Sequence, residues 1–195
     1  MSEESVKILE TKVLSDQYYV LRRFVYERTE RSGERVTQIR EVYDRGNGAA
    51  ILLYNRAAQT VILTRQFRMP TFVNGNATGM LIECCAGLLD RDNAEEAIRR
   101  ETAEETGYKI GAVEKVLEAY MSPGSVTEIL YLFVAEYTKD MKVSDGGGLE
   151  EESEDIEVLE IHYRRALEMV RAGEIKDGKT ILLLQYAELN KLIAG

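Results

Sequence analysis

The sequence predicts an α/β protein in which helices pack on a mixed β-sheet in an α/β/α sandwich, with an arm of β-strands before it. Two observations carry this prediction. Short runs rich in Val, Ile, Tyr and Phe, separated by polar and glycine turns, fill most of the first 88 residues and return at 129–137 and 155–163. Helical spacing of apolar or Ala, Glu and Arg residues is confined to one central segment and two C-terminal ones.

The strands are expected in two groups, which places a boundary between residues 1–45 and 46–195. The first group, VKILE, YYVLRRFVYER and RVTQIREVYDR, forms the arm, with the turn RSGER before its last strand. The second begins with NGAAILLYN and QTVILTRQFR, passes through a Gly and Asn loop, TFVNGNATG, and continues with MLIECCAGLL. Three later runs, KVLEAYM, EILYLFVAEY and DIEVLEIHY, complete the predicted sheet.

The central helix is expected over residues 93–106. This segment opens with Asn93, followed three residues later by Glu96, and stops at Gly107, which is the pattern of a capped helix. Two further helices, YRRALEMVRAGEI and TILLLQYAELNKLIA, are expected near the C-terminus.

Composition excludes several functions. The chain of 195 residues carries 25 Lys and Arg against 34 Asp and Glu, a net charge of −9, so a nucleic-acid or membrane-surface partner is not expected. No apolar run approaches the ~20 residues of a membrane span, and the charged N-terminus does not resemble a secretory leader. The adjacent Cys84 and Cys85 fit a reducing cytoplasm. A single histidine, His162, argues against a His-centred triad.

Three glutamates of the central helix point to metal chemistry. Glu101, Glu104 and Glu105 stand at i, i+3 and i+4, so their carboxylates project from one face. Like charges at this spacing destabilise a helix, whereas a hard divalent cation such as Mg²⁺ would bind them. A solvated acidic face is the alternative interpretation.

The segment GLLDRDNAEEAIRRETAEETGY resembles the signature of the Nudix hydrolase family. The matching residues are Gly87, Arg100, Glu101, Glu104, Glu105 and Gly107. Three positions depart from the pattern: Gly87 stands one residue too close to Arg100, Asn93 replaces the first glutamate, and Thr102 replaces an apolar residue. The first glutamate lies at the helix start, where Asp92 or Asn93 can act as the cap, so we interpret its absence as structural. The metal-binding glutamates are intact.

The resemblance implies a Nudix fold and Mg²⁺-dependent hydrolysis of a nucleoside diphosphate linked to another group. By the family pattern Arg100 pairs with a carboxylate of its own helix. The metal ligands implied are Glu101, Glu104, Glu105, Glu154 and the backbone carbonyl of Ala86.

Resemblance beyond this signature narrows the expected substrate. The segments LSDQYYVLRR, REVYDRGNGAAILLYN, TRQFR, YMSPGSVTE and GEIKDGKTILLL are similar to the branch of the family that cleaves GDP-mannose to GMP and mannose 1-phosphate. A neighbouring branch performs the same chemistry on ADP-ribose and is the first alternative. A Nudix module that binds a nucleotide sugar without hydrolysing it is the second.

The same resemblance implies a homodimer with exchanged N-terminal arms. Tyr18 would stack on the nucleotide and Arg68 would meet a phosphate. The substrate-binding residues implied are Tyr18, Ile39, Arg40, Glu41, Arg68, Ala86, Gly87, Leu88, Glu105, Glu128, Glu152 and Lys179. Each also has a purely structural interpretation, as a packing, strand or helix-start residue.

The catalytic base lies in the acidic loop LEEESEDIEV, which offers Glu150, Glu151, Glu152 and Glu154. Alignment from the following strand selects Glu154, and alignment from Gly148 selects Glu152. We prefer Glu154, with Glu105 and Glu152 as the other catalytic candidates. A solvated acidic loop in which none of these residues acts is the remaining alternative.

Overall fold

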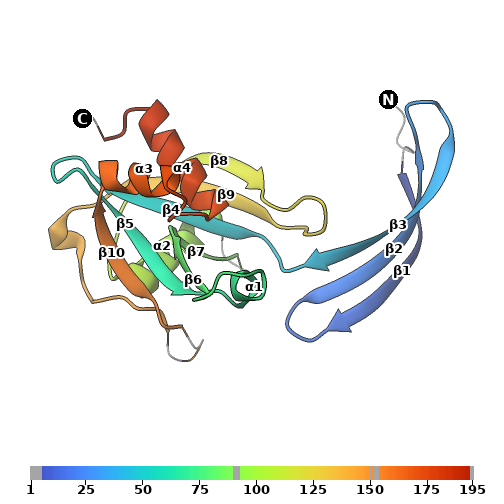
Figure 1. Ribbon diagram of the computed structural model, residues 1–195, viewed down its shortest axis with the longest axis horizontal. Coiled ribbons are helices and arrows are strands. Elements are labelled where there is room, and N and C mark those ends of the chain that lie inside the picture. The colour runs from blue at the N-terminus through green and yellow to red at the C-terminus, as the bar shows by residue number, and fades with distance from the viewer. Residues whose placement is uncertain (1–5, 90–92, 150, 152–153, 194–195) are drawn as a thin grey trace. The chain divides into compact units, whose positions relative to one another are not determined.

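The computed structural model describes residues 6–89, 93–149, 151 and 154–193 (Figure 1). It contains two compact units, which we describe separately. Unit 1 comprises the chain up to Asn47 together with Tyr120–Ile129, and unit 2 comprises Gly48–Ala119 and Leu130 onward.

Unit 1 is built on a three-stranded antiparallel sheet in the order β1-β2-β3. Gly33, in the turn before the last strand, has φ 88°, a conformation that residues with a Cβ rarely adopt. The strand arm predicted from the sequence is therefore confirmed. Its strands are β1 (Val6–Asp16), β2 (Val20–Thr29) and β3 (Arg35–Asp44).

A later segment of the chain also belongs to unit 1. The backbone N–H of Tyr43 donates to the carbonyl of Ser125 at 2.7 Å, and the N–H of Thr127 donates to the carbonyl of Tyr43 at 3.1 Å. The hydroxyl of Thr127 donates to Asp44 at 3.1 Å. The predicted boundary at residue 45 leaves this segment with the second domain.

Unit 2 contains a seven-stranded mixed sheet whose main path is β10-β5-β4-β9-β8. The central strand β4 is buried at every position, which explains why it reads as a continuous apolar run. β4 pairs parallel with β9 and antiparallel with β5. These strands are β4 (Gly48–Asn55), β5 (Thr60–Phe67), β8 (Glu114–Tyr120), β9 (Ile129–Glu136) and β10 (Glu157–His162).

The predicted strand MLIECCAGLL is divided at Cys84 into two strands with different partners. β6 (Met80–Glu83) pairs with β5, and β7 (Cys85–Leu88) pairs with β4. Between them, the N–H of Cys84 leaves the sheet and donates to the hydroxyl of Thr180 at 2.7 Å.

Helices cover both faces of this sheet, as the predicted sandwich requires. Ala49, Ile51 and Leu53 of β4 pack in one apolar cluster with Ile98 of α2. The alternate residues of β4 are equally buried and face the other way, where α4 contacts the strand and α3 lies against β5 and β10 (Figure 1). The helices are α2 (Ala94–Thr106), α3 (Tyr163–Arg171) and α4 (Gly178–Leu189).

The caps of α2 are those predicted. The side chain of Asn93 accepts hydrogen bonds from the N–H groups of Glu95 and Glu96, at 3.1 and 3.0 Å, and Gly107 ends the helix in the left-handed conformation. The helices differ from expectation in three places: a helix stands where a loop was predicted, α3 ends at Arg171 and not at Ile175, and α4 spans Gly178–Leu189 and not residues 180–194. A five-residue helix, α1 (Met69–Val73), begins where a loop was expected, because Pro70 favours the first turn of a helix. α3 stops before Gly173, whose φ is 72°.

None of the helices in the described residues is long and apolar enough to cross a membrane.

Candidate active site

The three glutamates of α2 occupy different surroundings. Glu105 is only 2% exposed, and its Oε2 accepts a hydrogen bond from the backbone N–H of Ala86 in β7 at 3.3 Å. The side chains of Glu101 and Glu104 are 15% and 26% exposed. At Glu105, therefore, the helix directs a carboxylate into the protein, and the solvated-face interpretation fails there.

Burial and neighbouring carboxylates disfavour the charged form of Glu105. Its pKa is raised to about 8, first by burial, while hydrogen bonds with Cys85 and Ala86 act in the opposite direction. The charges of Glu101 and Glu154 raise the pKa further, so both carboxylates lie within electrostatic reach of Glu105. A carboxylate of the central helix, Glu101, and one of the acidic loop, Glu154, therefore both influence Glu105.

Gly87 allows Glu101 to lie against the sheet. A Cβ atom at Gly87 would stand 2.1 Å from Cδ of Glu101, so a methyl group fits there only if the side chain of Glu101 moves aside. Gly87 is flanked in β7 by Ala86 and Leu88, which pair with Ala50 and Gly48 of β4. The leading glycine of the sequence signature therefore has a steric role beside a carboxylate.

Three consecutive glycines join the acidic loop to the end of α2. Gly146, Gly147 and Gly148 have φ values of 73°, 112° and 81°. The N–H of Gly147 donates to the carbonyl of Glu105 at 2.9 Å, and the N–H of Gly148 donates to the carbonyl of Glu104 at 3.2 Å. The loop therefore satisfies carbonyl groups that the end of a helix leaves without partners.

The same loop positions Glu154. Its Oε2 accepts a hydrogen bond from the N–H of Leu149 at 3.1 Å, and a Cβ atom at Gly148 would come within 2.3 Å of that oxygen. Of the other loop candidates, Glu151 is exposed, whereas Glu150 and Glu152 lie outside the described residues.

Arg100 pairs with carboxylates of its own helix. Its Nη1 donates to Glu104 at 3.0 Å, and its Nη2 lies 3.1 Å from Glu101. This is the arrangement expected for it, and it places a cation beside two of the predicted metal ligands.

Arg68 and Lys179, both predicted to bind substrate, meet at one buried carboxylate. Nε of Arg68 donates to Oε2 of Glu83 at 2.7 Å, and Nζ of Lys179 donates to Oε1 of the same residue at 2.5 Å. Asp177 also accepts from Lys179, at 2.9 Å, and caps α4. The pKa of Lys179 is lowered by burial but raised more strongly by Glu83 and Asp177, and the net shift is upward.

The remaining predicted residues belong to unit 1. Tyr18 is 83% exposed and makes an edge contact with Tyr19. Because side chains alternate along a strand, Ile39 and Glu41 lie on one face of β3 and Arg40 on the other. The side chain of Glu128, 12% exposed, pairs with Arg45 at 3.5 Å.

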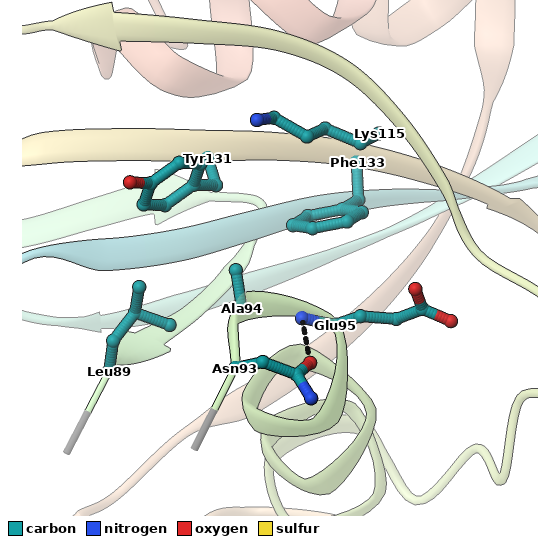
Figure 2. A pocket seen from close by; sticks show the side chains of 7 residues that line it. All are labelled: Leu89, Asn93, Ala94, Glu95, Lys115, Tyr131 and Phe133. Atoms are coloured by element: carbon teal, nitrogen blue, oxygen red, sulfur yellow. Dashed lines mark hydrogen bonds between the residues drawn. The ribbon is translucent and has the colours of Figure 1, made fainter. Parts of the chain in front are cut away.

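A cavity of about 410 Å³ lies apart from the carboxylates. Its walls come from the start of α2 and from β9, and Nζ of Lys115 stands 4.6 Å from the ring centre of Tyr131 (Figure 2). Neither Glu101, Glu105 nor Glu154 is among its lining residues, which are Leu89, Asn93, Ala94, Glu95, Lys115, Tyr131 and Phe133.

Comparison with known proteins agrees with this geometry over both parts of the chain. Residues 44–181 match the NUDIX domain, and residues 5–43 match the N-terminal domain of the GDP-mannose pyrophosphatase NudK. The chain belongs to the Nudix family. It is 56% identical, over 97% of its length and 98% of theirs, to proteins named GDP-mannose pyrophosphatase from Salmonella typhimurium and Salmonella typhi. A protein of that name from Citrobacter koseri is 54% identical over the same shares.

Nudix hydrolases generally use a divalent metal, and the donors at this site fit one. Carboxylate oxygens are the preferred ligands of hard cations, and the raised pKa of the buried Glu105 marks a place where added positive charge is favourable. Among the described residues, however, no group of three or more His, Cys, Asp or Glu side chains is arranged to hold a metal ion. The site therefore suits a divalent metal by the chemistry of its carboxylate donors and by its charge.

Sequence reasoning missed Glu83 and Asp177, although both contact a predicted residue. Glu83 is the one charged residue in MLIECCAGLL and is 3% exposed, so a lone carboxylate within an apolar strand was the available signal. Asp177 stands three residues before Thr180, whose N–H it accepts, which is a common spacing for a helix cap.

The contact between Gly87 and Glu101 yields a prediction for this Nudix site. Gly87→Ala adds a methyl group that meets only the flexible side chain of Glu101, so we expect a folded protein with a Tm within a few degrees of the parent. Displacement of the carboxylate should lower hydrolysis at least about ten-fold. Thermal unfolding and steady-state kinetics measure both effects.

Gly111→Ala is the matched control, because a Cβ atom at Gly111 meets nothing within 4 Å. It should retain full activity. Equal activity in the two variants would contradict the role of Gly87.

Proposed function

We propose that this chain is an Mg²⁺-dependent nucleotide-sugar pyrophosphatase that hydrolyses GDP-mannose to GMP and mannose 1-phosphate. The observation that carries the proposal is the identity of 56% to proteins named GDP-mannose pyrophosphatase over 97% of the chain, which includes the strand arm as well as the hydrolase domain. The carboxylate site supports the same conclusion, because a binding module that does not hydrolyse its ligand has no need of it.

The metal would be held by Glu101, Glu104, Glu105, Glu154 and the carbonyl of Ala86. Mg²⁺ suits an all-oxygen donor set, and when bound it neutralises phosphate charge and lowers the pKa of a bound water.

The remaining steps fall to side chains of this chain. Glu154 accepts one proton from the attacking water, while the bond between a bridging oxygen and the attacked phosphorus breaks. Glu154 is preferred to Glu152 because the N–H of Leu149 holds its carboxylate, which lies within electrostatic reach of Glu105. Arg68 binds phosphate oxygens, which a guanidinium contacts with two parallel donors. The backbone of Ala86, Gly87 and Leu88 flanks the pyrophosphate.

The arm is proposed to complete the site in a homodimer. Residues 1–45 act as the dimerisation arm and residues 46–195 as the hydrolase domain. The first strand exposes Val6, Ile8, Leu9 and Val13 by 47–59%, which favours a second copy of the chain as its cover. In an exchanged arrangement Tyr18, Arg40 and Glu41 would serve the substrate pocket of the other subunit. Ile39 would line the pocket from the arm, and Glu128 would contact substrate.

A reducing cytoplasm is the proposed location. Cys84 and Cys85 are both free and buried, and neither takes part in a disulfide.

The proposed substrate is tested by steady-state kcat/KM for GDP-mannose and ADP-ribose side by side, with Mg²⁺ and with a chelator. We expect a preference for GDP-mannose of at least about ten-fold, and release of GMP and mannose 1-phosphate, identified by mass, only when Mg²⁺ is present. A preference for ADP-ribose would overturn the substrate and keep the mechanism. Turnover of neither would favour a binding module.

Glu105→Gln tests the metal assignment. The variant replaces a carboxyl group whose ionisation is disfavoured by burial with a neutral amide of the same shape, so Tm should stay equal or rise, while the loss of a metal-binding carboxylate should lower kcat at least about 100-fold. Glu96→Gln, at an exposed position of the same helix, is the matched control and should retain parental turnover. Near-parental turnover of Glu105→Gln would exclude Glu105 as a ligand.

Ile8→Lys tests the arm. Ile8 is 59% exposed in β1, so a charge there should leave unit 1 folded but prevent burial against a second copy. Sedimentation should give a dimer for the parent and a monomer for Ile8→Lys. Lys7→Glu, at the adjacent position, is the control and should remain dimeric. A monomeric parent chain would contradict the homodimer.

A further inference from the structure

The charged cluster around Glu83 is buried more deeply than a surface ion pair. The side chains of Glu83, Lys179 and Asp177 are 4%, 11% and 13% exposed, and they come from β6 and from the start of α4. Arg68, at the end of β5, is the fourth member and the most accessible, at 40%. Three segments distant in sequence therefore converge on one carboxylate.

A stability role alone is a weak account of such a cluster. Removing charged groups from water costs several kcal/mol for each ion, and apolar residues of similar volume often replace a buried ion pair without loss of stability. A buried network with every charge paired fixes side-chain positions more closely than an apolar contact does. The Glu83 cluster is therefore better explained by the side chain that it holds in position.

Glu83 uses its two oxygens on two different cations. Oε1 accepts from Lys179 and Oε2 accepts from Nε of Arg68. Arg68 is thus held by Nε, the donor closest to its aliphatic stem. Within the described residues, no hydrogen bond of its two terminal nitrogens is found, and these are the donors that grip a phosphate in parallel.

The cluster is also linked to the carboxylates of α2. Burial is the largest single influence on the pKa of Arg68 and lowers it, but Glu83, Glu105 and Asp177 together raise it, and the net shift is upward. Arg68 therefore lies within electrostatic reach of Glu105 as well as of Glu83.

We propose that Glu83 is a positioning residue, which orients the guanidinium of Arg68 toward a phosphate of the substrate while Lys179, itself held by Asp177, fixes Glu83. This inference rests on the proposed function, in which Arg68 binds a phosphate. It assigns to Glu83 a role in substrate binding through Arg68, without contact between Glu83 and the substrate.

Glu83→Gln is the direct test, in the full-length protein with Mg²⁺. The amide keeps the shape of the side chain but offers only one acceptor oxygen to two cations. We expect KM for GDP-mannose to rise about ten-fold, with a smaller change in kcat, as in Arg68→Ala. The double variant should have a KM within about two-fold of Arg68→Ala, because Glu83 acts through Arg68.

Further variants separate positioning from folding. Glu83→Asp keeps the buried charge but shortens the side chain, so it should stay folded and still raise KM; it carries the test if Glu83→Gln does not fold. Glu160→Gln is the matched control. Glu160 accepts from Thr60 and Tyr137 at the opposite end of β5, so its loss should lower Tm without changing KM.

Calorimetric titration with inorganic pyrophosphate provides a readout that does not depend on turnover. Kd should rise about ten-fold in Glu83→Gln and in Arg68→Ala. If the parent does not hydrolyse GDP-mannose but the two variants still bind pyrophosphate about ten-fold more weakly than the parent, the proposed function is overturned and the role of Glu83 is kept. Folded Glu83 variants with parental KM and Kd, or a double variant whose losses multiply, would overturn the inference.

Discussion

The hydrogen bonds between the glycine loop and the end of α2 are the contact on which the site depends. A helix ends with carbonyl groups that lack partners, and here those of Glu104 and Glu105 accept from Gly148 and Gly147. The same two residues carry proposed metal-binding carboxylates. The loop thus finishes the helix and delivers Glu154 to Glu105 through one set of backbone contacts, which ties the geometry of the acidic site to a structural necessity of the helix.

The sheet supplies the other half of the site through the change of partner at Cys84. β6 stays with β5 and presents Glu83 to Arg68, whereas β7 joins β4 and presents Gly87 to Glu101. Because of the break, one short segment contributes Glu83 to the charged cluster and Gly87 to the acidic site.

Local signals made much of this structure predictable. Asn93 and Gly107 delimit α2 through contacts within a few residues of sequence. The spacing of its three glutamates places their side chains on one face of the helix. The Glu83 cluster was not predictable in this way, because it forms only when β5, β6 and α4 meet. Pattern reasoning selected Arg68 and Lys179 as substrate residues without the carboxylate that binds both. Tyr18, Ile39, Arg40 and Glu41 stay predictions, since their role depends on a second copy of the chain.

The parallel pairing of β4 with β9 has a consequence for how the protein reaches its native state. Gly48 pairs with Leu130, so the whole of α2 and the three strands β5, β6 and β7 lie inside the loop that this pairing closes. Closure of long loops costs chain entropy before any contact compensates for it, and domains rich in distant pairings fold slowly. The acidic helix can form early from its own caps, but its carboxylates acquire a binding geometry only when the last strands dock. Hydrolytic activity should therefore be among the last properties regained on refolding.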